Sequence, residues 1–208
     1  MRRDNYHHGN LATALTDAAT DLARTGGPEA VVLREAARQV GVSATAAYRH
    51  FASHANLIHE VKERCQTRLA ECMDAELAAS ATLDDPEAEA VRRLRALGMG
   101  YLRFATSEPG LFRTAFCHTD SEKEKLFDAW ESPAYARLAA VLDELAALGL
   151  IAPEVRPFAE VFPWATVHGL ANLLVDGPLG GIPEEYKKIV LERTVNAVVD
   201  GLCRRPMS

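Results

Sequence analysis

The 208-residue sequence lacks most of the features that mark membrane, secreted and metal-binding proteins. Its longest uncharged run covers the 15 residues from Val161 to Val175, whereas a helix needs about 20 apolar residues to cross a bilayer. The four cysteines are scattered without a C-x-x-C pair, which argues against a disulfide framework, a zinc ribbon and a thioredoxin-type redox motif. Residues 1–8 contain no apolar stretch that would serve as a secretory signal. We therefore expect a cytoplasmic protein that crosses no membrane and needs no metal or other cofactor.

Signature motifs of common enzyme classes are missing as well. The sequence contains no G-x-x-x-x-G-K-[ST] phosphate loop, no G-x-G-x-x-G fingerprint, no H-E-x-x-H zinc site and no G-x-S-x-G nucleophile elbow. We therefore do not expect an enzyme. An α-helical enzyme or a redox or metal sensor that uses His118, His168 or Cys117 stays open as an alternative, because a fold can bring distant residues together.

Acidic residues outnumber basic ones in the chain as a whole but not in its first quarter. The formal net charge is −6 at pH 7. Residues 1–54 contain six Lys and Arg against five Asp and Glu, with four of the seven histidines, whereas residues 55–208 contain 17 against 24. Since phosphates repel an acidic surface, only the first quarter suits contact with nucleic acid.

The composition also predicts the fold class. Alternating β-branched runs are nearly absent, while Ala, Leu, Glu and Arg dominate, which is typical of an all-α protein. Glycine and proline mark the ends of about nine helices. The expected helices cover residues 9–24, 33–40, 44–51, 53–81, 86 to the break at 108–110, 111–116, 121–148 with an interruption at 132–133, and two last segments opened by Pro153 and Pro183. We expect one domain of three short helices in residues 1–52 and a bundle of longer helices in residues 53–208.

Residues 33–51 carry the pattern of a helix-turn-helix, in which the second helix enters the DNA major groove. Two short helical segments flank a Gly-Val-Ser turn at residues 41–43, and the Ser43 hydroxyl is suited to cap the second segment. A glycine turn also occurs in ordinary helical hairpins, but its combination with Tyr-x-His-Phe at 48–51 is much more specific. The residues expected to pack inward are Ala36, Ala37, Val40, Val42, Ala47 and Phe51.

The outward face of the second segment offers groups suited to DNA. Thr45 and Arg49 can reach base edges, whereas Tyr48 and His50 can donate hydrogen bonds to phosphates. The side chains of residues 44–47 include alanines short enough for the helix to sit deep in a groove. The candidate DNA-binding residues are Ser43, Ala44, Thr45, Ala46, Tyr48, Arg49, His50 and His54.

At these residues the sequence resembles the tetracycline-repressor (TetR) family of one-component bacterial regulators. The family's DNA-binding core is similar to the start at Leu33, the Gly-Val-Ser at 41–43 and the Tyr-x-His-Phe at 48–51. Residues 6–11 and 164–169 resemble a subset with a Trp-His-Gly signature in its C-terminal domain. The resemblance implies an N-terminal helix-turn-helix domain and a C-terminal ligand-binding and dimerisation bundle. It further implies a repressor that a small-molecule ligand releases from a palindromic double-stranded DNA operator.

One position departs from the family pattern. Where the family usually has a lysine at the start of the fourth helix, this chain has Ser53 and His54. A lysine there would contact a phosphate, whereas histidine is mostly neutral near pH 7. We therefore expect DNA binding that is weaker or more dependent on pH than is usual for the family.

The uncharged segment 161–175 is expected to form a helix that is apolar on all sides, so one domain core would cover only part of it. The same helix of a second subunit is the simplest cover for the rest, and the resemblance implies the same homodimer through the last two helices. Pro163 is expected to kink this helix. The last helix is expected to contribute Tyr186, Ile189, Val190, Ala197, Val198 and Leu202.

Trp164, His168 and Asn172 follow one another at helical spacing, which suits the wall of a pocket. Polar residues at such positions are as typical of satisfied core or interface groups, so both interpretations stay open. Gly98 and Gly100 lie in the middle of a helix and indicate close helix crossings. Because the resemblance implies a small-molecule cavity, the candidate ligand-binding residues are Phe112, Phe116, Trp130, Trp164 and His168.

Overall fold

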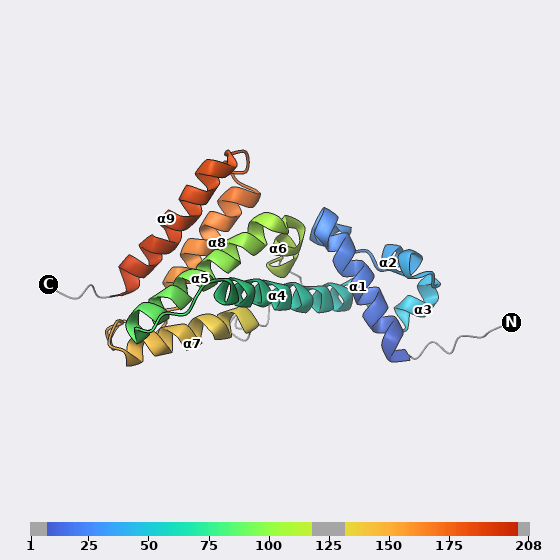
Figure 1. The fold of residues 1–208 in the computed structure, drawn as a ribbon. Coiled ribbons are helices and arrows are strands. Elements are labelled where there is room, and N and C mark those ends of the chain that lie inside the picture. The colour runs from blue at the N-terminus through green and yellow to red at the C-terminus, as the bar shows by residue number, and fades with distance from the viewer. Residues whose placement is uncertain (1–7, 118–131, 204–208) are drawn as a thin grey trace. The chain divides into compact units, whose positions relative to one another are not determined.

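The computed structural model describes residues 8–117 and 132–203, which contain nine α-helices and one short 3-10 helix (Figure 1). The expected all-α class is confirmed. In chain order the elements are α1 (His8–Gly26), the 3-10 helix (Pro28–Ala30), α2 (Leu33–Val40), α3 (Ala44–Tyr48), α4 (His54–Ala79), α5 (Pro86–Ser107), α6 (Pro109–Ala115), α7 (Pro133–Ala147), α8 (Val161–Val175) and α9 (Glu184–Leu202).

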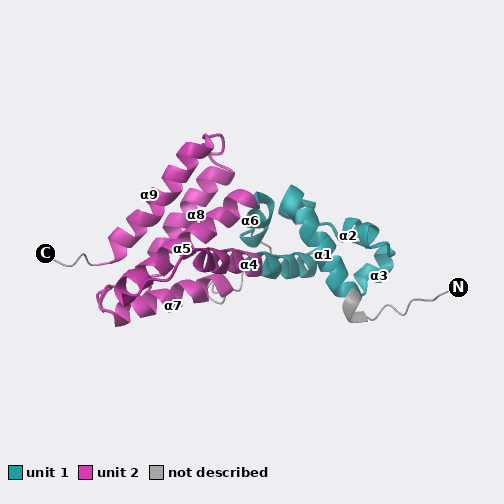
Figure 2. Ribbon diagram, viewed as in Figure 1, with its two compact units in different colours: residues 1–66, 108–126 teal, residues 67–107, 127–208 magenta. Residues whose placement is uncertain are grey.

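The chain forms two compact units (Figure 2). Unit 1 consists of residues 1–66 and 108–126, and unit 2 consists of residues 67–107 and 127–208. Helix α4 therefore begins in unit 1 and ends in unit 2, while α6 belongs to unit 1 although it follows α5 in sequence. This division by packing does not coincide with the division by function expected between residues 52 and 53, which stays a prediction.

Unit 1 is built on close contacts between small residues. In α6, a Cβ on Gly110 would lie 2.3 Å from the carbonyl oxygen of Ala23 and 2.4 Å from that of Arg24, so only glycine lets α6 lie this close to the end of α1. Helix α1 ends at Gly26, and Gly27 follows with φ 70°, as the Gly-Gly-Pro sequence predicts. The core of the unit includes Leu15, Ala19, Ala36, Ala47, Leu57 and Leu111, all at most 1% exposed.

In unit 2, α5 packs against α7, α8 and α9. Two glycines let α5 approach neighbouring helices closely. A Cβ on Gly98 would lie 3.1 Å from Cγ2 of Val195 on α9, and a Cβ on Gly100 would lie 2.6 Å from Cα of Met73 on α4. The interpretation of both glycines as helix crossings is thereby confirmed.

Two expectations about the penultimate helix are wrong. Residues 151–160 form turns and not the helix that Pro153 was expected to open, and α8 begins at Val161. Arg156 holds these turns through ion pairs with Asp143 (2.6 Å) and Glu160 (2.8 Å). Pro163 is the third residue of α8, where a backbone N–H has no partner within the helix, so its lack of an N–H breaks no helical bond and gives no reason for the expected kink.

Other helix ends follow local signals. Asp85 accepts a hydrogen bond from the N–H of Ala88 (3.1 Å) ahead of α5, and Ser132 accepts one from Tyr135 (3.2 Å) ahead of α7. Helix α3 ends at Tyr48, earlier than the expected residue 51. The expected helix over 121–131 lies outside the described residues.

Candidate functional site

The helix-turn-helix of unit 1 consists of α2, a three-residue turn and α3. Gly41 adopts the left-handed conformation (φ 78°) that ends α2. Ser43 then caps α3, because its Oγ accepts a hydrogen bond from the N–H of Ala46 (3.2 Å). Ala47 is fully buried and Phe51 is 6% exposed, as predicted for the inward face. These anchors fix which side of α3 is left for solvent.

The solvent-facing side of α3 carries the residue types expected to contact DNA. Thr45 and Arg49 are exposed, and Tyr48 is 46% exposed. Ala44, Ala46 and His50 are half-buried. The Tyr48 hydroxyl is therefore accessible to a partner on this side of α3.

His54 makes a contact that the sequence did not reveal. Its Nε2 lies 2.7 Å from the carbonyl oxygen of Val31 and forms a hydrogen bond with it. This bond joins the start of α4 to the segment ahead of α2 within unit 1. Since the Val31 carbonyl accepts this bond, Nε2 carries a proton, and His54 could donate to a phosphate only through Nδ1 of the protonated imidazole.

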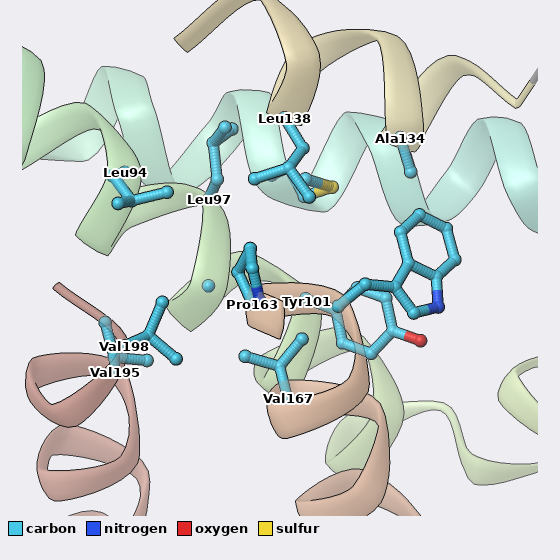
Figure 3. Close-up of a pocket in the computed structure, with 12 residues that line it drawn as sticks. Leu94, Leu97, Tyr101, Ala134, Leu138, Pro163, Val167, Val195 and Val198 are labelled. Carbon is cyan, nitrogen blue, oxygen red and sulfur yellow. The ribbon is translucent and has the colours of Figure 1, made fainter. Parts of the chain in front are cut away.

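Unit 2 contains a cavity between α4, α5, α7, α8 and α9 (Figure 3). The space between its lining side chains amounts to about 440 Å³ when the part that is open to solvent is counted. Among the residues that the structure describes, no Lys, Arg, Asp or Glu lines it. The wall includes Leu94, Leu97 and Tyr101 of α5, Leu138 of α7, Trp164 of α8 and Val198 of α9.

Tyr101 and His168 form a hydrogen-bonded pair beside this cavity. The Tyr101 hydroxyl lies 2.7 Å from Nδ1 of His168, and the Tyr101 ring meets the Trp164 ring edge to face at 5.9 Å. Burial raises the pKa of Tyr101 well above 10, so the hydroxyl keeps its proton. Burial also lowers the pKa of His168 below 6.5, so the imidazole is neutral at pH 7.

The expected ligand site is therefore only partly assembled. Trp164 lines the cavity. His168 is not among the described lining residues and is connected to the wall by its hydrogen bond to Tyr101. Phe112 and Phe116 belong to α6 and its end in unit 1, where their ring centroids lie 5.2 Å apart; they are not among the described residues that line this cavity, and their part in ligand binding stays a prediction. Trp130 lies outside the described residues. Sequence patterns did not single out Tyr101, whose partner His168 lies 67 positions away.

Helices α8 and α9 keep an apolar surface exposed. On α8, Phe162 is 47% exposed and Leu173 is 44% exposed, whereas Leu174 is 6% exposed and faces the core of the chain. On α9, Tyr186 is 57% exposed and Ile189 is 43% exposed. The expected surface residues Val198 and Leu202 are instead buried within the chain, at 4% and 7% exposed.

The alternative sites gain no support from the described residues. In residues 8–117 and 132–203, no group of three or more His, Cys, Asp or Glu side chains could hold a metal ion. His118 lies outside this part of the chain. Burial raises the pKa of the Cys65 thiol to about 12, which leaves it almost no reactive thiolate near pH 7. In the same ranges, no helix is both long and apolar enough to span a membrane.

The lowered pKa of His168 predicts a pH-dependent stability. Below about pH 6.5 the unfolded chain takes up a proton on this residue before the folded chain does, so the free energy of unfolding should fall as the pH falls. His168→Gln keeps a hydrogen-bonding side chain but cannot titrate. Urea unfolding at pH 7.5, 6.5 and 5.5 should show a smaller loss for His168→Gln than for the unmodified protein; equal losses would contradict the assignment.

The comparisons with known proteins agree with this geometry. The family model described as bacterial regulatory proteins of the tetR family matches residues 15–61. The model described as the tetracyclin repressor-like C-terminal domain matches residues 94–198, half of the chain. A comparison with curated proteins found no match.

Several solved structures share the fold. A protein of unknown function from Rhodococcus sp. RHA1 is 24% identical, with a TM-score of 0.75 over 97% of this chain and 100% of that one. A TetR family transcription regulator from Marinobacter aquaeolei VT8 is 19% identical, with a TM-score of 0.65 over 94% and 96% of the two chains. A putative regulator of the same family from Shewanella sp. PV-4 is 16% identical, with a TM-score of 0.65 over 94% and 99%. With both family models matched and its helix-turn-helix in place, this chain belongs to the tetracycline-repressor family and is a DNA-binding transcriptional regulator, not an enzyme.

Proposed function

We propose that the protein is a cytoplasmic homodimer that represses transcription from a palindromic operator and leaves it when a small molecule binds in unit 2. The observation that carries the DNA-binding part is the exposed side of α3, which is held outward by the Ser43 cap and the buried Ala47. Two such helices in a dimer would read half-sites about 34–36 Å apart, or a multiple of that distance. The Trp-His-Gly signature of residues 164–169 supports placing the chain in the subset that carries it.

The exposed side of α3 divides into two roles. Thr45 and Arg49 would read base edges, because a hydroxyl and a guanidinium match base acceptors. Tyr48 and His50 would bind phosphates, as would His54 through Nδ1, and these contacts fix position without reading sequence. Ser43, Ala44 and Ala46 would let the start of α3 approach the groove closely.

These roles predict two different outcomes of substitution. Arg49→Ala should cost about 1–3 kcal/mol at the preferred operator and relax the preference at one base pair. Tyr48→Phe removes one hydroxyl and should weaken binding to all sequences by a similar factor. Selection of bound DNA from a random pool, followed by titration of single sites at fixed salt, distinguishes the two outcomes.

The matched control is Arg68→Ala, which removes one positive charge from unit 2. It should change neither the preferred sequence nor the operator affinity by more than a small factor. A changed motif at unchanged affinity in Tyr48→Phe would contradict the division of roles.

The proposed dimer uses the apolar surface of α8 and α9. Leucine, tyrosine, phenylalanine and isoleucine side chains that are 43–57% exposed on neighbouring helices form a surface that association would bury. Burying the same patch of two copies against each other gives the twofold symmetry that a palindromic operator requires.

The proposed ligand site is the cavity of unit 2. Its wall is mostly apolar, as is typical of small-molecule pockets. A ligand would act by favouring a conformation of the dimer that fits the operator poorly, so the operator and the ligand would compete through conformation.

A further inference from the structure

The cavity of unit 2 offers a ligand almost no polar atoms. Of the lining side chains in the described part of the chain, only those of Tyr101 and Trp164 have a hydrogen-bonding nitrogen or oxygen, and the others are aliphatic, methionine or proline, with one glycine. The Tyr101 hydroxyl is bound to His168, which is not part of the wall. Figure 3 shows the Tyr101 hydroxyl on the side away from Leu94 and Val198.

This arrangement determines what can enter. A charge inside would lose its water without gaining a partner, which costs many kcal/mol. An unpaired hydroxyl or amide would also be penalised. The part of a ligand that occupies the cavity must therefore be a hydrocarbon.

The positions of the lining residues favour a chain over a flat ring system. The rings of Tyr101 and Trp164 lie together, with their centroids 5.9 Å apart, and Figure 3 shows Leu94, Val195 and Val198 on the opposite side of the pocket from Tyr101. The Trp164 ring already meets Tyr101 edge to face and Tyr135 at 5.9 Å, so aromatic neighbours surround it before any ligand arrives. Aliphatic side chains from several helices line the rest of the pocket, and a flexible unbranched alkyl chain can adapt its conformation to the space between them.

We infer that the cavity binds the unbranched aliphatic chain of an amphipathic molecule, with the tail between α5, α7, α8 and α9 and the polar head outside the apolar wall. This inference rests on the proposed function, since it names the chemical class of the ligand in the same site. His168 is then a positioning residue: it holds the Tyr101 hydroxyl out of the cavity so that only the ring faces the chain.

A homologous series of 1-alkanols from butanol to dodecanol, titrated calorimetrically into the full-length protein, tests the inference. Each methylene that enters an apolar cavity contributes about 0.8 kcal/mol, so the affinity should rise about fourfold per carbon and then level off once the cavity is full. The binding heat capacity should be negative. An affinity independent of chain length, or naphthalene binding more tightly than octanol, would overturn the inference.

Two variants of α7 locate the chain. Ala134 is fully buried in the cavity wall and Ala140 is exposed on the same helix, so Ala134→Phe fills the cavity and Ala140→Phe is its matched control. The first should lower decanol affinity at least tenfold and the second should leave it unchanged. Leu138→Ala enlarges the cavity and should move the plateau to a longer alkanol, which keeps the test decisive if Ala134→Phe does not fold. An unmoved plateau would overturn the placement.

The same proteins distinguish this inference from the proposed function. Operator binding is measured with and without decanol. If alkanol affinity rises about fourfold per carbon but decanol leaves the operator complex intact, the inferred site for an alkyl chain is supported and ligand-controlled repression is contradicted. If alkanol affinity does not change with chain length while operator binding persists, only the inferred site for an alkyl chain is contradicted.

Discussion

Leu173→Glu is expected to convert the protein into monomers and to lower operator affinity at least a hundredfold. Leu173 is 44% exposed in the single chain, so a glutamate there stays solvated and the monomer should fold normally. In the proposed dimer the same carboxylate would be buried twice, once per subunit, without a partner, at a cost of several kcal/mol. A dimer binds both half-sites of the operator at once. Loss of the dimer therefore removes most of the operator affinity even though α3 is unchanged.

Sedimentation velocity together with operator titration measures both effects. Ala140→Glu places the same charge on an exposed position of α7 and should leave the dimer and the affinity intact. Leu174→Glu provides the opposite comparison: because Leu174 is 6% exposed, its glutamate should unfold unit 2, which circular dichroism would detect. A Leu173→Glu protein that stays dimeric with full operator affinity would place the interface elsewhere.

Gly110→Ala is expected to destabilise unit 1 by about 1–3 kcal/mol, because the new methyl group has no room. Its Cβ would lie 2.3 Å from the carbonyl oxygen of Ala23 and 2.4 Å from that of Arg24. Both are backbone atoms of α1 and cannot rotate aside, so α6 would have to move away from α1. Thermal unfolding should show a Tm lower by about 2–4 °C for each kcal/mol lost.

Gly181→Ala is the matched control for this substitution. No atom lies within 4 Å of the Cβ that it would add, so its stability should stay within about 0.5 kcal/mol of the unmodified protein. An equally stable Gly110→Ala protein would mean that α6 is not held against α1 as described.

Local signals in the sequence predicted much of the fold. The left-handed Gly41, the Ser43 cap and Pro183 ahead of α9 each act within a few residues, so the end of α2 and the starts of α3 and α9 followed from the sequence. The uncharged run 161–175 coincides with α8, because charged residues resume where the helix leaves the core.

Contacts between distant residues were not predictable in this way. Pro153 has the local features of a helix start, but the turns that follow are fixed by Arg156 and its ion pairs. Phe112 lies in unit 1 because of the close approach at Gly110, which depends on where α6 packs and not on its own composition.

Two polar contacts show the same limit at the candidate sites. A hydrogen bond over 67 positions joins Tyr101 to His168, and one over 23 positions joins His54 to Val31. The sequence identified the two histidines as polar groups of interest, but helical spacing carries no information about such partners.

The most direct test of the proposed account is to sequence the DNA that the purified protein selects from a random pool. We expect a palindrome whose half-sites are centred about 10 base pairs, or a multiple of that, apart and whose complex contains two chains. The Arg49→Ala protein should select a motif relaxed at one symmetric position in each half-site. Selection of a single non-palindromic site bound by one chain, or an unchanged motif in Arg49→Ala, would contradict the proposal that a symmetric dimer reads its operator through α3.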